Sequence, residues 1–463
     1  MIQIKTVKLN FLLNLTRMFL GMAFIVITTP YIARILGPKS LGKVEYVNSL
    51  ITYFMLFSAL GIPSYGVREV AKYRDNSKEL SKLVLEILTI LCITTIIGYI
   101  VLFGLLYSYK SLYELKDIIL VMSINIICNN IGIEWFYQGI ENQLYITKRF
   151  ILIRILTLIA IFIFIKNKED YLIYAFILVM MQSGSNILNF INLRKYINFK
   201  GIQFSNLKLD KHMKPILIIF SATVATTIYL QLDSIMIGNV SKEAVGIYIV
   251  PNKLIRMILV VVTALGTVLL PRITNCLKNK DYDNYNSYMN ISLNYIFFIA
   301  LPLAVSTFLL SDDIINIMAG SQFIASTLTL KILSPILFTI GIAYFLGFQL
   351  LYPLGLERYY TYSVIVAALV NFVFNYLMLF LARKYIKKID FFSIKRLKYF
   401  IAIFIMSLVI IFIKKFEFSS LETIIYSLIF GGVSYIGVLL LLKEEICVEG
   451  IKIIKKKVKR YEK

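Results

Sequence analysis

The chain has 463 residues, of which 59% are hydrophobic and 16% are charged, and its mean hydropathy is +0.78. Water-soluble domains carry about 25% charged residues, so this composition excludes a soluble protein and indicates one that crosses a membrane many times. The net charge of +23 would suggest a nucleic-acid partner in a soluble protein. Here Lys and Arg cluster between apolar runs, as the positive-inside rule describes for cytoplasmic loops, so we expect no nucleic-acid partner.

Thirteen apolar runs follow one another along the chain, and most of them are long enough for a helix to cross a bilayer. They cover approximately 11–36, 44–66, 83–107, 118–138, 150–165, 171–191, 215–237, 245–270, 291–310, 328–351, 359–381, 397–414 and 421–442. The first run has the length of a span and lacks a small-residue cleavage site, so we expect no cleavable signal peptide. The sequence therefore predicts an all-α polytopic membrane protein.

The loops predict the orientation of these spans. Basic residues follow the second, fourth and sixth runs: Arg68, Lys72, Arg74, Lys78 and Lys82, then Lys148 and Arg149, then Arg194, Lys195, Lys200, Lys208, Lys211 and Lys214. The loops on the opposite side carry little charge, or they carry acidic residues such as Asp312 and Asp313. We therefore expect the basic loops and the N-terminus to be cytoplasmic.

The chain also contains an internal repeat. An offset of 204 positions matches Gly42 with Gly246 and Asn48 with Asn252, and further matches follow in parallel order. This pattern predicts two repeated six-helix lobes. Transporters built from repeated halves place their site where the halves meet, near the bilayer midplane, so Asn48 and Asn252 are predicted to face that site.

The second copy of the repeat is shorter than the first. Arg149 precedes Arg194 by 45 residues, whereas their counterparts Arg358 and Arg383 are only 25 apart. The deficit of 20 residues is the length of one transmembrane helix. We expect a lobe at 1–200 with spans one to six, a lobe at 201–390 with spans seven to eleven and one span missing, and two further helices with a basic tail at 391–463. Residues 383–398 are predicted to stay cytoplasmic, and span eleven is predicted to form a re-entrant or broken hairpin.

Six segments together resemble a known family: PYIARILGPKSLGKVEY, ALGIPSYGVREVAK, IGIEWFYQGIE, YLQLDSIMIGNVSKEAVGIY, ALGTVLLPR and LGFQLLYPLG. They are similar to segments of the bacterial oligosaccharide flippases of the polysaccharide transporter family, within the multidrug/oligosaccharidyl-lipid/polysaccharide exporter superfamily. The resemblance implies a V-shaped transporter with two six-helix lobes, often followed by two extra helices. It also implies a flippase that moves undecaprenyl-diphosphate-linked oligosaccharide repeat units across the bacterial cytoplasmic membrane for O-antigen or capsule synthesis.

A flippase for such a lipid needs cations for the diphosphate, and amides and hydroxyls for the sugars. The candidate diphosphate ligands are Arg34, Lys253 and Arg256, and Arg256 lies about 15 Å into its span, where charge is costly and usually functional. The candidate sugar-binding or cavity-lining residues are Asn48, Tyr53, Gln138, Gln231, Asn252, Gln349 and Asn371. Glu45, Glu134 and Asp233 are candidates for ion coupling or for ion pairs.

Each of these candidates also has a structural interpretation. Arg34 is near the end of its span, where a long side chain can extend to the membrane interface. Glu134 and Gln138 are four residues apart and equally suit a structural hydrogen bond. Asp233 suits a carboxylate that binds a coupling proton or ion, and it equally suits a counter-ion for Lys253 or Arg256.

The remaining sequence features limit the classes of function. Four cysteines without ligand spacing and a single histidine, His212, in a predicted basic loop favour neither a metal site nor thiol chemistry, and we expect no cofactor. There is no nucleotide-binding motif, and nothing predicts an enzyme. The alternatives are a cation-coupled multidrug or small-molecule antiporter of the same superfamily and a membrane-embedded glycosyltransferase or polymerase. For a flippase, the expected partners are membrane lipid, a polysaccharide polymerase and glycosyltransferases.

Overall fold

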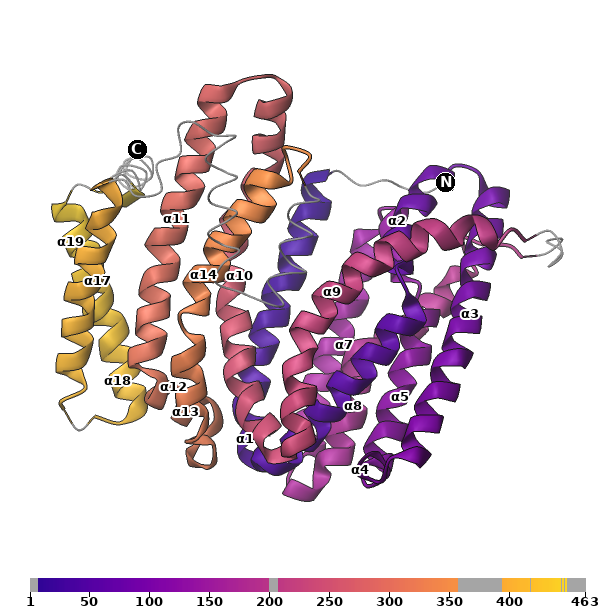
Figure 1. Ribbon diagram of the computed structural model, residues 1–463, viewed down its shortest axis with the longest axis horizontal. Coiled ribbons are helices and arrows are strands. Elements are labelled where there is room, and N and C mark those ends of the chain that lie inside the picture. The colour runs from indigo at the N-terminus through magenta and orange to yellow at the C-terminus, as the bar shows by residue number, and fades with distance from the viewer. Residues whose placement is uncertain are drawn as a thin grey trace, which may run out of the picture. The chain divides into compact units, whose positions relative to one another are not determined.

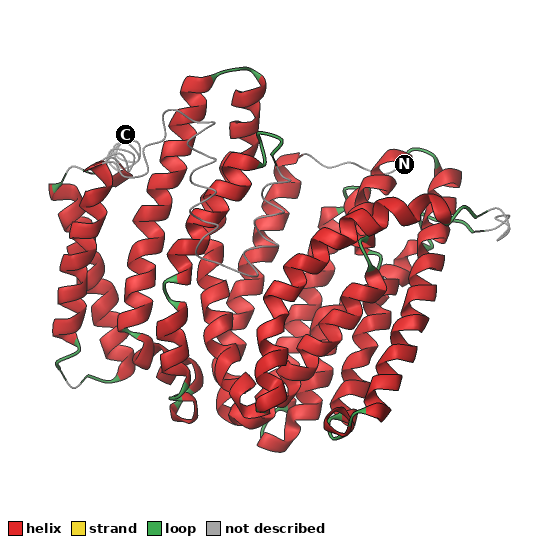
Figure 2. Ribbon diagram, viewed as in Figure 1, coloured by secondary structure: helices red, strands yellow, loops and turns green. Residues whose placement is uncertain are grey.

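A computed structural model describes residues 7–199, 207–356, 394–416, 418–442, 444 and 446–447. Every regular element in these ranges is a helix (Figure 2), which confirms the predicted all-α fold. Eight helices within them are long and apolar enough to cross a membrane. The protein is therefore a polytopic membrane protein. Residues 357–393, which include the predicted span at 359–381 and Asn371, lie outside the described ranges.

The chain divides into two compact units, Met1–Ile249 and Val250–Lys463. The described helices of the first unit are α1 (Val7–Ala59), α2 (Ile62–Tyr73), α3 (Ser77–Ser108), α4 (Lys110–Tyr113), α5 (Lys116–Ile131), α6 (Glu134–Gly139), α7 (Gln143–Phe164), η1 (Lys168–Asp170), α8 (Tyr171–Leu193) and α9 (Asp210–Val240). The division falls inside α10 (Lys242–Lys278), which contributes its first turns to the first unit. The domain boundaries expected at residues 200 and 390 stay predictions.

The first unit is built around α1, which packs against α3, α5, α7, α8 and α9 (Figure 1). It consists of two helices joined at a kink, which cover the apolar run predicted at 11–36 and most of the run predicted at 44–66. The break between them is Gly37, whose backbone is not helical (φ 67°, ψ 174°). Because this φ is unfavourable for a residue with a Cβ, glycine is what allows the helix to bend here.

A second break divides the run predicted at 118–138 into α5 and α6. Between these helices Ile133 has a left-handed backbone (φ 38°, ψ 36°), which is rare for a β-branched residue. Immediately after it, Trp135, Phe136 and Tyr137 enter a buried apolar cluster that also contains Ile62 of α2. The burial of three aromatic rings stabilises this short helix, and the opposite side of the helix carries Glu134 and Gln138.

Two glycines that the internal repeat matches, Gly42 of α1 and Gly246 of α10, lie against each other's helices in the first unit. A Cβ added at Gly42 would collide with the carbonyl oxygen of Lys242, and a Cβ added at Gly246 would collide with that of Pro38. Pro38 and Lys242 are themselves separated by 204 positions. The contact is therefore reciprocal, as in an interface with two-fold symmetry.

The second unit contains the rest of α10 and, within the described ranges, α11 (Tyr282–Leu309), α12 (Ser311–Ala319), η3 (Ser321–Phe323), α13 (Ser326–Leu333), α14 (Ile336–Tyr344), η4 (Phe345–Leu351), α17 (Ile394–Ile413), α18 (Ser420–Tyr426), η5 (Ser427–Gly431) and α19 (Gly432–Leu441). Here α11 packs against α14 and α17, and α17 packs against α19 (Figure 1). One apolar core joins them, and it includes Phe297, Phe345 and Tyr399.

Candidate functional site

The first unit contains a polar pocket of about 260 Å³ between α2, α3, α5, α6 and α8. Its polar lining consists of amide side chains, one carboxylate and one indole: Asn129, Asn130, Gln138, Gln182 and Asn186, with Glu134 and Trp135. Amides carry both donors and acceptors, and an indole offers a flat apolar face with one donor. This combination suits a ligand rich in hydroxyl groups.

The break at Ile133 places the α6 residues at the pocket. Glu134 begins α6, and Gln138 follows one turn later, so both lie on the same side of this helix. Asn186 of α8 packs against Gly132, where an added Cβ would collide with the amide. Nearby, Asn189 donates a hydrogen bond to the Gly132 carbonyl (2.5 Å) and holds α8 against the break.

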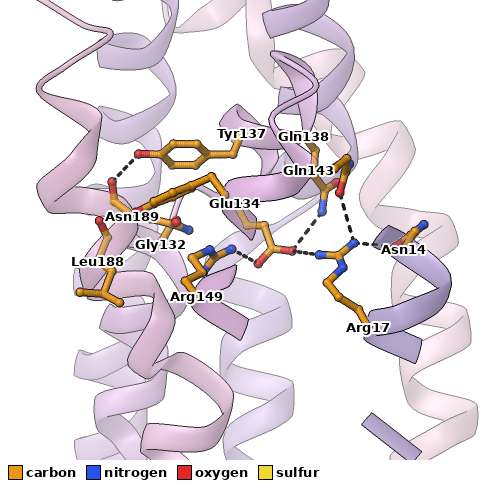
Figure 3. Close-up of polar contacts among 11 residues, drawn as sticks. Asn14, Arg17, Gly132, Glu134, Tyr137, Gln138, Gln143, Arg149, Leu188 and Asn189 are labelled. Carbon is orange, nitrogen blue, oxygen red and sulfur yellow. Dashed lines mark hydrogen bonds and ion pairs between the residues drawn. The ribbon is translucent and has the colours of Figure 1, made fainter. Parts of the chain in front are cut away.

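Glu134 is the centre of an ion cluster that Figure 3 shows in close-up. Its carboxylate lies 2.5 Å from Nη2 of Arg149 and 3.6 Å from Nη1 of Arg17, and it accepts a hydrogen bond from Gln138 (3.2 Å). Arg17 also donates to Gln143 (3.4 Å). Two guanidinium groups therefore share one carboxylate, and the cluster has a net positive charge while the pocket lining itself is acidic.

Arg149 is the more deeply buried of the two arginines. Its side chain is 3% exposed, and its Nε and Nη1 have no hydrogen-bond partner in the described part of the chain. A buried guanidinium without its counter-ion would be costly, so the pair with Glu134 fixes both side chains. It also ties α7 to α6 directly beside the pocket.

Hydrogen-bonded amides extend from the pocket into α1. Asn125 donates to Gln182 (3.1 Å), and Gln182 donates to Asn48 (3.1 Å). Asn48 donates in turn to the buried carboxylate of Glu45 (3.4 Å), which also accepts from Tyr174 (3.4 Å). The network places the candidate residues Glu45 and Asn48 in direct connection with the pocket residue Gln182.

Four other candidates of the first unit lie on α1 and α9. Arg34 is exposed, and Tyr53 is half-buried on the same helix. Gln231 accepts a hydrogen bond from Ser49 (3.2 Å), which links α9 to α1. Asp233 is exposed and accepts from the Tyr248 hydroxyl (2.7 Å).

The candidates of the second unit are in different environments. Arg256 is exposed and donates to Asn252 one turn earlier on α10 (2.6 Å), and Lys253 is half-buried on the same helix. Gln349 is 1% exposed within η4 and accepts from Ser292 (2.5 Å). This buried bond suits a structural role for Gln349 better than a place in a cavity.

Sequence reasoning missed Arg17, Trp135 and Asn186, and it assigned Arg149 to a cytoplasmic loop. The motif IGIEWFYQGIE, which contains Glu134, Trp135 and Gln138, was the available signal, because a single tryptophan stands there between two polar residues. Asn186 lies in a predicted span whose amide residues form no recognisable motif, so the sequence offered no signal for it.

His212 is also placed differently from the expectation. The sequence predicted a basic loop, but this residue lies in the first turn of α9 and is buried. Its Nδ1 is 2.5 Å from the Tyr65 hydroxyl, and its Nε2 is 2.9 Å from the Glu86 carboxylate, which also pairs with Lys211 (2.9 Å). In the described ranges no cluster of His, Cys, Asp and Glu could hold a metal ion.

A family model described as "Polysaccharide biosynthesis protein" matches residues 7–277, which is more than half of the chain. The chain belongs to the polysaccharide biosynthesis protein family. The resemblance inferred from the six short segments is thereby confirmed. A second family model, described as MatE, matches residues 218–377.

Two relatives of this family member carry the name "Putative O-antigen transporter". The protein of Escherichia coli (strain K12) is 21% identical over 351 residues, which is 75% of this chain and 83% of the relative. The protein of Shigella flexneri is 24% identical over 323 residues, which is 63% of this chain and 72% of the relative.

Two solved structures share the fold of this family member. One is the lipid II flippase MurJ in an inward closed conformation, with a TM-score of 0.73, 16% identity, and coverage of 95% of this chain and 99% of that chain. The other is an inward-facing multidrug resistance MATE family transporter of the MOP superfamily, with a TM-score of 0.55, 14% identity, and coverage of 95% and 96%. At these identities the likeness shows the fold alone.

Proposed function

We propose that this protein is a flippase that translocates undecaprenyl-diphosphate-linked oligosaccharide repeat units across the bacterial cytoplasmic membrane. The observation that carries this proposal is its membership in the polysaccharide biosynthesis protein family over residues 7–277. The relatives named as O-antigen transporters and the fold likeness to a lipid flippase support transport rather than catalysis.

The residues supply what such a substrate needs. Lys253, Arg256 and Arg34 are cations on membrane-spanning helices and suit the diphosphate, since Arg pairs with phosphate through two parallel hydrogen bonds and Lys acts as a point charge. The amides of the pocket suit sugar hydroxyls. The polymerase and glycosyltransferases that would use or make the repeat unit are expected partners of the pathway.

Deletion of the gene in its host tests the proposal. The deletion strain is expected to lose surface polysaccharide and to accumulate lipid-linked oligosaccharide on the cytoplasmic side, and the wild-type gene is expected to restore export. The match of residues 218–377 to the MatE model favours one alternative, a cation-coupled antiporter for drugs or small molecules. Intact surface polysaccharide together with new drug sensitivity would support that alternative and contradict the flippase.

Replacing Lys253 or Arg256 with alanine is expected to weaken export in the restored strain by about 10- to 100-fold, because a hydrogen bond to a charged group contributes about 1.5–3 kcal/mol. Arg256→Lys is expected to restore export only in part, since the paired geometry is lost. The measurement is surface polysaccharide per cell at equal protein level. Lys278→Ala, at the exposed end of the same helix, is the control, and full export by both alanine variants would exclude these cations as diphosphate ligands.

The proposed orientation places the N-terminus in the cytoplasm. Asp75 follows α2 and Lys110 follows α3, and both are exposed. In a variant without native cysteines, Asp75→Cys is expected to resist a membrane-impermeant thiol reagent in whole cells, whereas Lys110→Cys is expected to react. Both positions should react after permeabilisation. The reverse pattern in whole cells would place the N-terminus outside.

A further inference from the structure

We propose that the pocket of the first unit binds one uncharged sugar ring of the transported lipid, an inference that rests on the proposed function. The observation behind it is Asn186. Its side chain is 7% exposed and lines the pocket, and within the described ranges its amide makes no hydrogen bond. Its amide nitrogen and oxygen are open to the pocket rather than enclosed, so they can exchange water for the hydroxyl groups of a ligand.

The neighbouring amides are held in fixed orientations. Asn130 donates to Thr95 (2.7 Å) and accepts from Asn129 (3.3 Å), and Gln182 both donates and accepts. A connected network of this kind keeps each amide from rotating. The pocket is therefore prepared for a ligand before the ligand arrives, which lowers the entropy cost of binding.

The lining selects the class of sugar. Glu134 is the charged residue in the lining, and the two arginines that pair with it do not line the pocket. An acidic sugar would therefore lie beside a carboxylate without a cation to contact, which disfavours its binding. Pro63 and Leu91 offer apolar contacts for the C–H groups of a ring, beside the indole of Trp135. The volume of about 260 Å³ is below the range of drug-sized ligand sites, which begins near 300 Å³, so the pocket suits a single ring rather than a whole repeat unit.

Trp135 provides the test, because it is the only tryptophan in the chain and it lines the pocket. The full-length protein in lipid nanodiscs is titrated with glucose, galactose, rhamnose and N-acetylglucosamine while its tryptophan fluorescence is recorded. At least one of these sugars is expected to cause a saturable change at millimolar concentration. Glucuronic acid, the charged comparison, is expected to cause none.

Two variants connect the signal to the pocket. Asn186→Leu and Gln138→Met keep the approximate length of each side chain and remove its amide, and each is expected to weaken the response about tenfold or more. Ser185→Ala on the same helix as Asn186 removes a hydroxyl group outside the lining and is expected to leave the response unchanged. No response to any neutral sugar in the wild type, or an equal response in all three variants, would overturn the proposal.

Lipid-linked ligands test whether the pocket binds a free sugar or the sugar of the transported lipid. Together with export, they also distinguish failure of the pocket assignment from failure of the proposed function. Nanodiscs with undecaprenyl-diphosphate-linked N-acetylglucosamine are expected to give the change at a lower ligand concentration than the free sugar, and undecaprenyl diphosphate alone is expected to give none. A response to free sugar only would contradict a site for the lipid-linked substrate. Because export is measured in cells, normal export without any fluorescence response refutes the pocket assignment alone, whereas a response without export refutes the flippase.

Discussion

Gly42→Ala is expected to destabilise the protein strongly, although it adds a single methyl group. That group would overlap the backbone carbonyl oxygen of Lys242, and a backbone atom cannot move without shifting its helix. Overpacking in a well-packed interior costs about 1–3 kcal/mol when side chains can adjust, and the cost here should reach or exceed that range. Thermal unfolding of the purified protein in detergent measures the loss.

The reciprocal contact makes the prediction more specific. Gly246→Ala is expected to cause a similar loss, because its added methyl group would overlap the Pro38 carbonyl. The double variant should lose less than the sum, since helices already forced apart by one methyl group have room for the other. Gly104→Ala is the control, because a Cβ there would meet nothing within 4 Å. Wild-type stability in either single variant at the contact would contradict this packing.

The local pattern of the sequence was sufficient to predict the all-α membrane fold. Apolar runs of span length follow directly from the need to satisfy the backbone inside a bilayer. The repeat was visible for a related reason. Gly42 and Gly246 cannot be exchanged for a larger residue where two helix backbones meet, so both copies contain glycine at the position that makes the contact.

The details of the helices could not be read from hydropathy. A run such as 118–138 looks uniform because its apolar residues continue through the break at Ile133. Nothing local favours a left-handed isoleucine, and the burial of Trp135 and its neighbours compensates for it. That break is also what places Glu134 and Gln138 at the pocket.

The ion cluster and the pocket depend on residues that are distant in the chain. Arg17 and Arg149 meet at Glu134 although more than a hundred positions separate the two arginines. The positive-inside rule counts Arg149 as a loop charge, since it considers composition and not pairing. His212 was placed in a loop for the same reason, because the basic residues around it hid its buried contact with Glu86.

The cluster around Glu86 joins three helices of the first unit. The carboxylate, which is 0% exposed on α3, accepts from the backbone N–H of Lys208 (2.9 Å) and lies near His212 and Lys211 at the start of α9. Because an ionised carboxylate only accepts, Nε2 of His212 donates to it, and Nδ1 accepts from Tyr65 of α2. Glu86 is therefore the common acceptor on which α9 is anchored.

Glu86→Ala is expected to destabilise the protein by about 1–3 kcal/mol or more, the range found when a buried hydrogen-bond donor is left without its acceptor. The loss arises because the buried imidazole of His212 and the N–H of Lys208 are left without an acceptor, while Lys211 can turn toward water. Glu86→Gln should lose clearly less, since its amide oxygen still accepts one of these bonds. Equilibrium unfolding in detergent compares both with Glu79→Ala, which removes an exposed carboxylate from the same helix and should change stability by less than about 0.5 kcal/mol. If Glu86→Ala is as stable as Glu79→Ala, Glu86 does not anchor α9.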